Sequence, residues 1–329
     1  MSEPLLSVRG LTTVFDVGRA PLVAVNDVSF DIRAGETLGL VGESGSGKSV
    51  TAYSLMRLLA PPGRIASGQV IFQGQDLLAL SEREMCAVRG AGIGLVFQEP
   101  MAALNPVMRV GRQIGEALVV HGMATSRQAR DRAIELLRAV KIADPERRVD
   151  DYPHQLSGGM RQRVMLAVAL ACKPPLVIAD EPTTALDVTV QAQILDLLRE
   201  MKRMFDLSLL LITHDLGVIA EVADRVAVMY AGRIVEEGPV RTIFREPAHP
   251  YTRGLLASIP RGLAGGRLVA IDGTVPSLSA LPPGCAFAPR CPSRLDVCDQ
   301  VVPPDVQLAD GHRTRCVLYA PPAAVGGAP

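Results

Sequence analysis

Short apolar runs recur along this chain, and each stops abruptly at glycine, proline or charged residues. Runs of this length predict buried strands. The clearest of them cover residues 37–41, 68–72, 93–97, 176–179 and 208–213. Residues 4–41 as a whole read as short strands with a break at 17–21, which predicts an antiparallel start to the fold.

Helical spacing of apolar residues appears between these runs, at 107–121, 126–140 and 158–172. Strand and helix alternate as far as Tyr230, where residues 231–233 predict a hairpin turn into a last strand. Alternation of this kind is typical of an α/β fold.

A glycine-rich loop separates the strand at 37–41 from a helix expected over 49–60. The loop reads GESGSGKS, the spacing of a P-loop. Its glycines let backbone N–H groups turn toward phosphate oxygens, and the N-terminus of the following helix attracts anions. The expected ATP contacts are Gly42, Glu43, Ser44, Gly45, Ser46, Gly47, Lys48, Ser49 and Val50. Lys48 is expected to reach the β- and γ-phosphates, and Ser49 to ligate Mg²⁺.

Two adjacent acids close the strand at 176–179. Asp180 and Glu181 stand where the sheet of a P-loop protein places its carboxylate for Mg²⁺. We expect Asp180 to hold the metal, directly or through water, and Glu181 to accept the proton of the attacking water. An acid pair that follows an apolar strand and precedes Pro182 favours this interpretation over a solvated strand end.

Composition narrows the class of protein. The 34 basic and 34 acidic residues balance, and aromatic residues make up only 4% with no Trp, so nothing indicates a nucleic-acid partner. The start MSEPLLSVRG lacks the pattern of a signal peptide. The longest apolar stretch, 164–172, is too short to span a bilayer. Any membrane role is therefore expected to depend on another chain.

The segment LSGGMRQR at 156–163 is the most specific signal in the sequence. Ser157 is expected to cap the helix that follows, and Gly158 and Gly159 leave its first N–H groups open as a second anion site. With the P-loop and the acid pair, this segment makes the chain resemble the ATP-binding subunit of an ABC transporter. The resemblance implies that Ser157, Gly158, Gly159 and Met160 complete the ATP site of a partner subunit.

Other motifs of that family appear in order, and the resemblance assigns their roles. Gln98 matches the glutamine that contacts Mg²⁺ and the attacking water, so the implied metal ligands are Ser49, Gln98 and Asp180. His214 matches the switch histidine at the γ-phosphate. The implied catalytic residues are Glu181, His214 and Gln98.

Two further matches concern adenine and the dimer. Phe15 resembles the aromatic residue that stacks on adenine, with a plain strand residue as the alternative. Ala185, Leu186 and Asp187 resemble the segment that crosses the dimer interface. The family fold implied is a RecA-like core with an antiparallel β subdomain and a helical subdomain.

Two segments resemble ATPases of oligopeptide and dipeptide importers in particular: FQEPMAALNPV at 97–107 and EPAHPYTRGLLASIP at 246–260. The resemblance predicts a nucleotide-binding domain over 1–245, with its helical subdomain at about 100–160. A small Cys-rich C-terminal extension is predicted over 246–329.

Such an ATPase would power uptake of di- and oligopeptides from the cytoplasmic face of the cell membrane. The implied partners are a second ATPase subunit, commonly a paralogue, two permease chains and an extracytoplasmic peptide-binding protein. The cargo stays open, because glutathione-like molecules and nickel complexes move through related systems. A soluble ABC-type protein and a redox-sensing regulator are alternatives, although the chain lacks the heptad arms or second cassette typical of the former.

The tail carries four cysteines, Cys285, Cys291, Cys298 and Cys316, spaced C-x5-C-x6-C-x17-C. Four thiols without histidine favour a [4Fe–4S] cluster, and the importer group resembles this chain in carrying such a tail. Zinc and inert thiols remain alternatives, although structural zinc sites usually show a shorter gap between ligands. Cys86 and Cys172 are expected to be buried small hydrophobes, and His312 a solvated loop residue.

Overall fold

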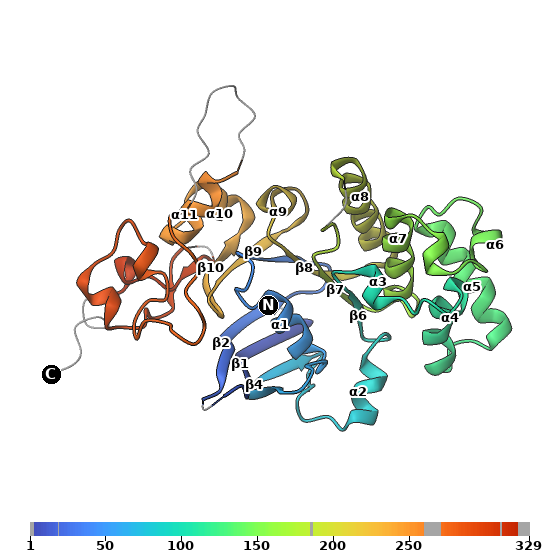
Figure 1. Cartoon of the computed structure of the whole chain (residues 1–329), viewed down its shortest axis with the longest axis horizontal. Helices are drawn as coiled ribbons and strands as arrows, with labels where there is room; N and C mark the ends of the chain where they lie inside the picture. Colours follow the sequence, from blue (N-terminus) through green and yellow to red (C-terminus); the bar gives the residue numbers. More distant parts are fainter. Residues whose placement is uncertain (1–2, 19, 185–186, 260–270, 310, 322–329) are drawn as a thin grey trace. The chain divides into compact units, whose positions relative to one another are not determined.

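The computed structural model describes residues 3–18, 20–184, 187–259, 271–309 and 311–321 (Figure 1). The chain divides into two compact units, which we describe separately. The helical unit contains Ile32–Glu36 and Ala79–Ile212, together with residue 3. The P-loop unit contains Pro4–Asp31, Thr37–Leu78 and the chain from Thr213 onward.

The strands of the helical unit are parallel and hydrogen-bonded in the order β8 (Ser208–Thr213), β7 (Leu176–Asp180) and β6 (Ile93–Val96). In the register, Leu176 of β7 pairs with Ile93 on one side and Ser208 on the other. Every residue of β7 and β8 is buried, which is why these strands read as unbroken apolar runs instead of alternating ones. The three strands predicted here are confirmed to within one residue.

The helices of this unit are α2 (Glu82–Val88), α3 (Pro100–Ala103), α4 (Val110–Val120), α5 (Ser126–Ala139), α6 (Pro145–Arg148), the 3₁₀ turn η1 (Pro153–Gln155), α7 (Gly158–Ala169) and α8 (Val188–Phe205). α5 begins with a capping box between Thr125 and Gln128. α4 begins later than predicted, because the Gln113 side chain bonds the loop before it, at Asn105 and Met108. α7 ends at Ala169, earlier than the predicted helix over 158–172.

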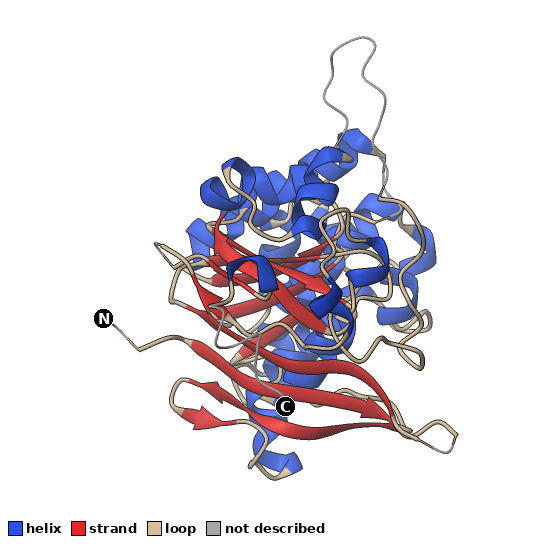
Figure 2. Ribbon diagram, turned by 90° about the vertical axis from the view of Figure 1, so that its left-hand side faces the viewer, coloured by secondary structure: helices blue, strands red, loops and turns tan. Residues whose placement is uncertain are grey.

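The strands of the P-loop unit belong to two sheets, and Figure 2 draws all strands of the chain in red. The strands of the first, in spatial order, are β2 (Leu22–Ile32), β1 (Leu6–Phe15), β4 (Gly63–Phe72) and β5 (Gln75–Asp76). Those of the second are β11 (Val306–Gln307), β12 (Arg313–Thr314), β10 (Arg233–Pro239), β9 (Arg225–Tyr230) and β3 (Thr37–Val41). β3 and β9 are parallel, whereas β9 and β10 form the predicted hairpin through a turn at Ala231 and Gly232, both with positive φ.

The helices of the P-loop unit are α1 (Lys48–Leu55), α9 (Leu216–Val222), α10 (Val240–Arg245), α11 (Pro250–Ala257) and the 3₁₀ turns η2 (Ala288–Arg290), η3 (Asp296–Asp299) and η4 (Val317–Tyr319). α1 is shorter than the predicted helix over 49–60, and that prediction is wrong at its end. Arg57 adopts the left-handed conformation, and the Leu58 N–H donates to the Tyr53 carbonyl at 2.8 Å, which closes the helix.

The C-terminal part of the chain joins the second sheet through β12, which pairs with β10. On β10 the buried carboxylate of Glu236 accepts the N–H groups of Ala248 and His249 at 2.6 and 2.9 Å. Its third partner is His312 Nε2, at 2.7 Å. The side chain of His312 is therefore buried, and the prediction of a solvated loop histidine is wrong.

The neighbouring residue on β10 makes a second set of contacts. Glu237 forms ion pairs with Arg225 on β9 and with Arg313 on β12, and its side chain is 3% exposed. Successive residues of a strand point to opposite faces of the sheet. The two acids thus anchor the C-terminal segment on both faces of β10.

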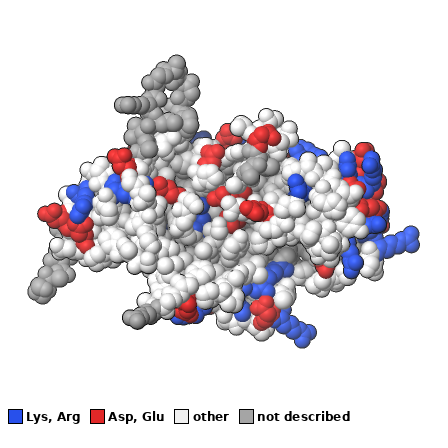
Figure 3. Space-filling model, in the orientation of Figure 1, with Lys and Arg blue, Asp and Glu red and all other residues white. Residues whose placement is uncertain are grey.

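Among the described residues, no helix combines the length and apolar character that crossing a membrane requires. Charged side chains of both signs are interspersed over the helical unit, as Figure 3 shows for one face. Several form ion pairs there, including Arg130 with Asp150 and Arg138 with Glu146.

Candidate functional site

The P-loop is enclosed by backbone at its two ends. A Cβ at Gly42 would lie 2.2 Å from the Met229 carbonyl oxygen, and one at Gly47 would lie 2.5 Å from that of Ala24. Gly47 also has a φ of 102°, in the region that favours glycine. Gly45 has open space around its Cβ position. Packing therefore requires glycine at positions 42 and 47. The sequence analysis predicted glycine in this loop for a different reason, the approach of the phosphates.

Polar groups of the loop suit an anion. Lys48 is buried, and its Nζ donates to the carbonyl oxygens of Gly42 and Glu43 at 2.8 and 3.0 Å. The Ser46 Oγ is buried without a hydrogen-bond partner among the described residues. A buried hydroxyl in that state costs about 1–3 kcal/mol, which a ligand oxygen would recover. These groups fit a phosphate chain, with Ser49 beside them at the start of α1.

Phe15 lies at the end of β1, opposite Gly63 of β4. Two residues earlier on the same face, the Thr13 Oγ1 lies 2.7 Å from the Ser54 Oγ of α1. Because residues two apart point to the same face of a strand, the Phe15 ring is on the α1 side of the sheet. This is the side expected of an adenine contact, and stacking on adenine itself stays a prediction.

The structure brings together two of the predicted catalytic residues in the helical unit. Gln98 Nε2 donates to Glu181 Oε2 at 3.0 Å, and the Thr184 hydroxyl donates to the same oxygen at 2.7 Å. Glu181 has a φ of 44°, a strained conformation of the kind found at functional sites. Asp180, the last residue of β7, is fully buried. Two donors thus fix the orientation of a carboxylate that can accept a proton.

His214 follows the end of β8 and is exposed. The next residue, Asp215, caps α9 by accepting the N–H of Gly217 at 2.8 Å. The imidazole is therefore carried by a capped strand–helix junction and is accessible to a ligand. Its contact with a γ-phosphate stays a prediction.

The predicted signature residues form an open helix end. The Ser157 Oγ accepts the Met160 N–H at 3.3 Å and caps α7, as predicted. Ser157 and Gly158 are exposed, and a Cβ at Gly158 would meet no atom within 4 Å. Asp187 is exposed as well and caps α8. Ala185 and Leu186 lie outside the described residues.

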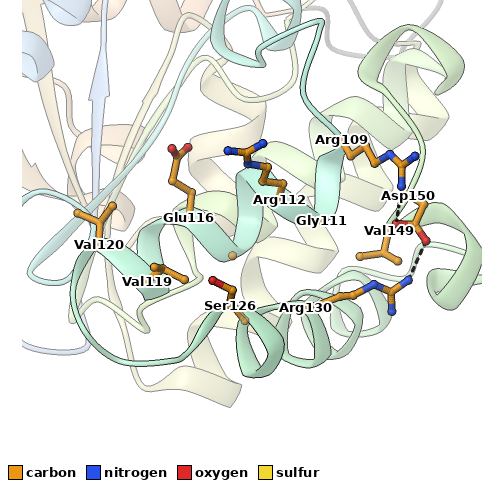
Figure 4. Close-up of a pocket in the computed structure, with 12 residues that line it drawn as sticks. Arg109, Gly111, Arg112, Glu116, Val119, Val120, Ser126, Arg130, Val149 and Asp150 are labelled. Carbon is orange, nitrogen blue, oxygen red and sulfur yellow. Dashed lines mark hydrogen bonds and ion pairs between the residues drawn. The ribbon is translucent and has the colours of Figure 1, made fainter.

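A groove of about 500 Å³ lies between α4 and α5 of the helical unit (Figure 4). We call it the α4–α5 groove. On one side of it, Asp150 forms ion pairs with Arg109 and Arg130, at 3.3 and 2.7 Å. At the other side, Val119 and Val120 are 42% and 75% exposed. The groove thus offers an apolar contact beside a charged one.

The four cysteines of the tail belong to one segment of the P-loop unit. The Cys285 N–H donates to the Cys298 carbonyl at 2.7 Å. Burial raises the pKa of Cys285 to about 11, and the thiols of Cys298, Cys316 and Cys291 add to the rise. However, no group of three or more His, Cys, Asp or Glu side chains is arranged to hold a metal ion in the described parts of the chain. A metal at these cysteines stays a prediction.

The remaining cysteines differ from each other. Cys172 is buried, as predicted. Cys86 is exposed, and the prediction that it is a buried small hydrophobe is wrong. It lies on the short helix α2, where only Met85 is buried, so the apolar face is one residue wide.

Two residues of the P-loop unit that sequence analysis did not assign to the ATP site contact the P-loop. The Tyr251 hydroxyl accepts the Glu43 N–H at 2.9 Å. The Arg290 guanidinium binds both carboxylate oxygens of Glu43, at 2.7 and 3.0 Å. This bond raises the pKa of Arg290 further above its ordinary value. Tyr251 falls within the segment 246–260 that the sequence singled out, whereas no sequence pattern marks Arg290.

Comparison with known families gives two matches. A family described as "ABC transporter" matches residues 25–184. A second, described as "Oligopeptide/dipeptide transporter, C-terminal region", matches residues 235–298.

Curated relatives match over nearly the whole chain. The dipeptide transport ATP-binding protein DppD of Bacillus subtilis is 52% identical over 96% of this chain and 95% of its own. A putative peptide import ATP-binding protein of Brucella melitensis is 53% identical over 98% and 99%. The oligopeptide transport ATP-binding protein AppD of Bacillus subtilis is 50% identical over 96% and 97%.

Among solved structures, a dimeric ATP-binding cassette in a post-hydrolysis state with ADP and phosphate has a TM-score of 0.65. It is 28% identical to this chain and covers 72% of it and 99% of itself. The match supports the cassette fold predicted from the sequence.

Proposed function

The chain belongs to the ABC transporter ATP-binding family, in the group of dipeptide and oligopeptide transport proteins, and we propose that it hydrolyses ATP to drive uptake of short peptides. The observation that carries this proposal is the continuous match, at about half identity, across both the cassette and the C-terminal region. A match to the cassette alone would support ATP hydrolysis but would not indicate which solute is transported. The match over residues 235–298 is what points to peptides.

The proposed chemistry divides among the residues placed above. Lys48 binds the β- and γ-phosphates, and Ser49, Gln98 and Asp180 hold Mg²⁺. When bound, Mg²⁺ supplies positive charge to the phosphate oxygens. Glu181, oriented by Gln98 and Thr184, accepts the proton of the attacking water.

Three further roles complete the ATP site. His214 contacts the γ-phosphate, and Phe15 stacks on adenine. The exposed end of α7, capped by Ser157, binds the ATP held by a partner subunit. Asp187 lies in that dimer interface.

The proposed assembly contains a second ATPase subunit, two permease chains and an extracytoplasmic peptide-binding protein. A paralogue is proposed as the second ATPase. The chain would sit peripherally on the cytoplasmic face of the membrane. The α4–α5 groove supports a permease contact in the helical unit, since it pairs the exposed valines Val119 and Val120 with the ion pairs of Asp150.

We also propose a domain division into a nucleotide-binding domain over 1–245, with its helical subdomain at about 100–160, and a C-terminal extension over 246–329. In that extension we propose a [4Fe–4S] cluster at Cys285, Cys291, Cys298 and Cys316, with zinc as the alternative. Protein purified without oxygen should contain iron and sulfide, and Cys291→Ser should lower both. Stoichiometric zinc without iron would overturn the cluster.

Reconstituted vesicles test the transport function. The complete complex should accumulate labelled di- or oligopeptide when ATP is present, and its ATP hydrolysis should rise when the loaded binding protein docks outside. A complex carrying Glu181→Gln in this chain is the control, because it keeps assembly and should lose transport. ATP hydrolysis with uptake of glutathione or a nickel complex but no peptide would refute the cargo.

A further inference from the structure

Glu43 places a carboxylate in a loop whose role is to bind phosphate. It directly follows Gly42, at the start of the P-loop. A negative charge beside the phosphates of ATP opposes their binding unless a cation neutralises it. The cation that pairs with this carboxylate comes from the C-terminal extension.

Arg290 binds Glu43 with both arms of its guanidinium. Nη1 lies 2.7 Å from Oε2 and Nη2 lies 3.0 Å from Oε1, the bidentate geometry that gives the strongest pairs. The Arg290 side chain is only 5% exposed. Its Nε donates to the Asp272 carbonyl at 2.9 Å, and Nη1 lies 3.4 Å from the Tyr230 hydroxyl. These contacts hold the guanidinium in place independently of a nucleotide.

Tyr251 holds the backbone of the same P-loop residue. Its hydroxyl accepts the Glu43 N–H at 2.9 Å. Its ring is fully buried, with centroids 4.6 Å from Tyr230 and 5.4 Å from Phe287. A ring packed in such a cluster cannot shift its hydroxyl without moving α11, to which it belongs. The extension therefore binds Glu43 twice, at its backbone N–H through Tyr251 and at its carboxylate through Arg290.

We propose that Arg290 and Tyr251 are positioning residues of the ATP site, with Arg290 neutralising the Glu43 carboxylate and Tyr251 fixing the Glu43 peptide in its phosphate-binding form. Both act through Glu43 and need no contact with ATP. This inference deepens the proposed ATPase function and rests on it. It makes the C-terminal extension part of ATP binding.

Charge variants of the full-length chain test the proposal through binding of the non-hydrolysable analogue AMP-PNP. Arg290→Gln should weaken binding about tenfold, because it leaves a bare carboxylate beside the phosphates. Glu43→Gln should tighten binding about threefold, because the Arg290 charge then faces the phosphates. The double variant should recover most of the loss, since neither charge remains.

Two more variants separate positioning from general damage. Tyr251→Phe should weaken binding about threefold, because it removes an acceptor from the Glu43 N–H without changing charge. Arg294→Gln is the matched control and should bind as the unaltered chain does, since its ion pair with Asp299 is on the exposed surface of the same segment. In the assembled complex, Arg290→Gln should raise the KM for ATP more than it lowers kcat.

The outcomes are distinct. Unchanged binding by Arg290→Gln would overturn the proposal. So would a double variant as weak as Arg290→Gln alone, because the arginine would then matter for folding and not for charge. If Arg290→Gln fails to fold, Glu43→Gln decides by itself, since weaker binding there contradicts the charge argument. Failure of the unaltered chain to bind AMP-PNP would instead count against the ATPase function.

Discussion

Acidification should lower the opening free energy of α11 in the C-terminal extension, because of the buried side chain of His249. This side chain is buried at the start of α11, and its Nδ1 accepts the Tyr251 N–H at 3.0 Å. Burial, together with the nearby charge of Arg253, lowers the pKa of His249 from an ordinary value of 6.5 to about 3. A proton on Nδ1 would turn this acceptor into a donor, and the hydrogen bond from the Tyr251 N–H would be lost.

The sign and size of the effect follow from proton linkage. The unfolded chain binds a proton at His249 below pH 6.5, whereas the folded chain stays neutral down to about pH 3. The stability contributed by the neutral imidazole is therefore complete above pH 6.5 and is lost progressively as the pH falls toward 3. Each pH unit in this window costs about 1.4 kcal/mol, so the loss at pH 5 is about 2 kcal/mol.

Hydrogen exchange of the α11 amides measures this loss where it occurs. His249→Asn keeps an oxygen that can cap the helix and removes the titrating group. Between pH 7.5 and 5, the opening free energy of α11 should fall in the unaltered chain and stay nearly constant in His249→Asn, after correction for intrinsic exchange. His154→Asn, at an exposed position of the helical unit, is the control and should follow the unaltered chain.

The reasoning would be refuted by parallel curves for the unaltered chain and His249→Asn over this pH range. A loss that appears in both must come from other groups. An opening free energy that stays constant in the unaltered chain between pH 7.5 and 5 would also contradict it, because the linkage begins at the unfolded pKa.

Other predictions concern the ATP site. Glu181→Gln should keep ATP binding and lower single-turnover hydrolysis about 10²–10⁴-fold, as expected for loss of a general base, and a normal rate in a dimer whose other site is inactive would contradict the assignment. Gly47→Ala should abolish ATP binding because its Cβ would lie 2.5 Å from the Ala24 carbonyl oxygen. Gly45→Ala meets open space and adds only the strain of its φ of 78°, so it should weaken binding but still bind measurably in the same titration. Ser157→Ala should impair the site that contains the partner's P-loop, which mixed dimers with one inactive P-loop can measure; impairment of its own P-loop site would refute this.

The strands that sequence analysis located best are those buried on both faces. Thr37–Val41 and Ser208–Thr213 match the predicted runs, because a strand covered on both sides must be apolar throughout. β4 was predicted only over 68–72, although it begins at Gly63. Its first half contains no buried residue, and it is a strand because β1 pairs with it, which local composition does not reveal.

The errors at single residues have the same origin. His312 follows a glycine in a turn-rich tail, which favours an exposed residue. It is buried because Glu236, 76 positions earlier, offers its carboxylate. A polar side chain is stable in the interior only with such a partner, and a partner this distant has no signature in the spacing.

The acidic residue of the P-loop, Glu43, is a feature of the sequence that motif matching does not use. The motif permits any residue at the position of Glu43, so matching it raises no question about that residue. Electrostatics does raise a question about Glu43, because an acid among phosphate-binding groups repels the phosphates. Native sequences keep such an unfavourable charge where another group compensates for it. The sequence therefore implied a cation near Glu43 without saying which. Arg290 is 247 positions away, in a tail that β12 and the contacts of Glu236 and Glu237 anchor to β10. We therefore expect the buried acids of β10 to support ATP binding by this acidic P-loop, because they fix the tail that carries Arg290.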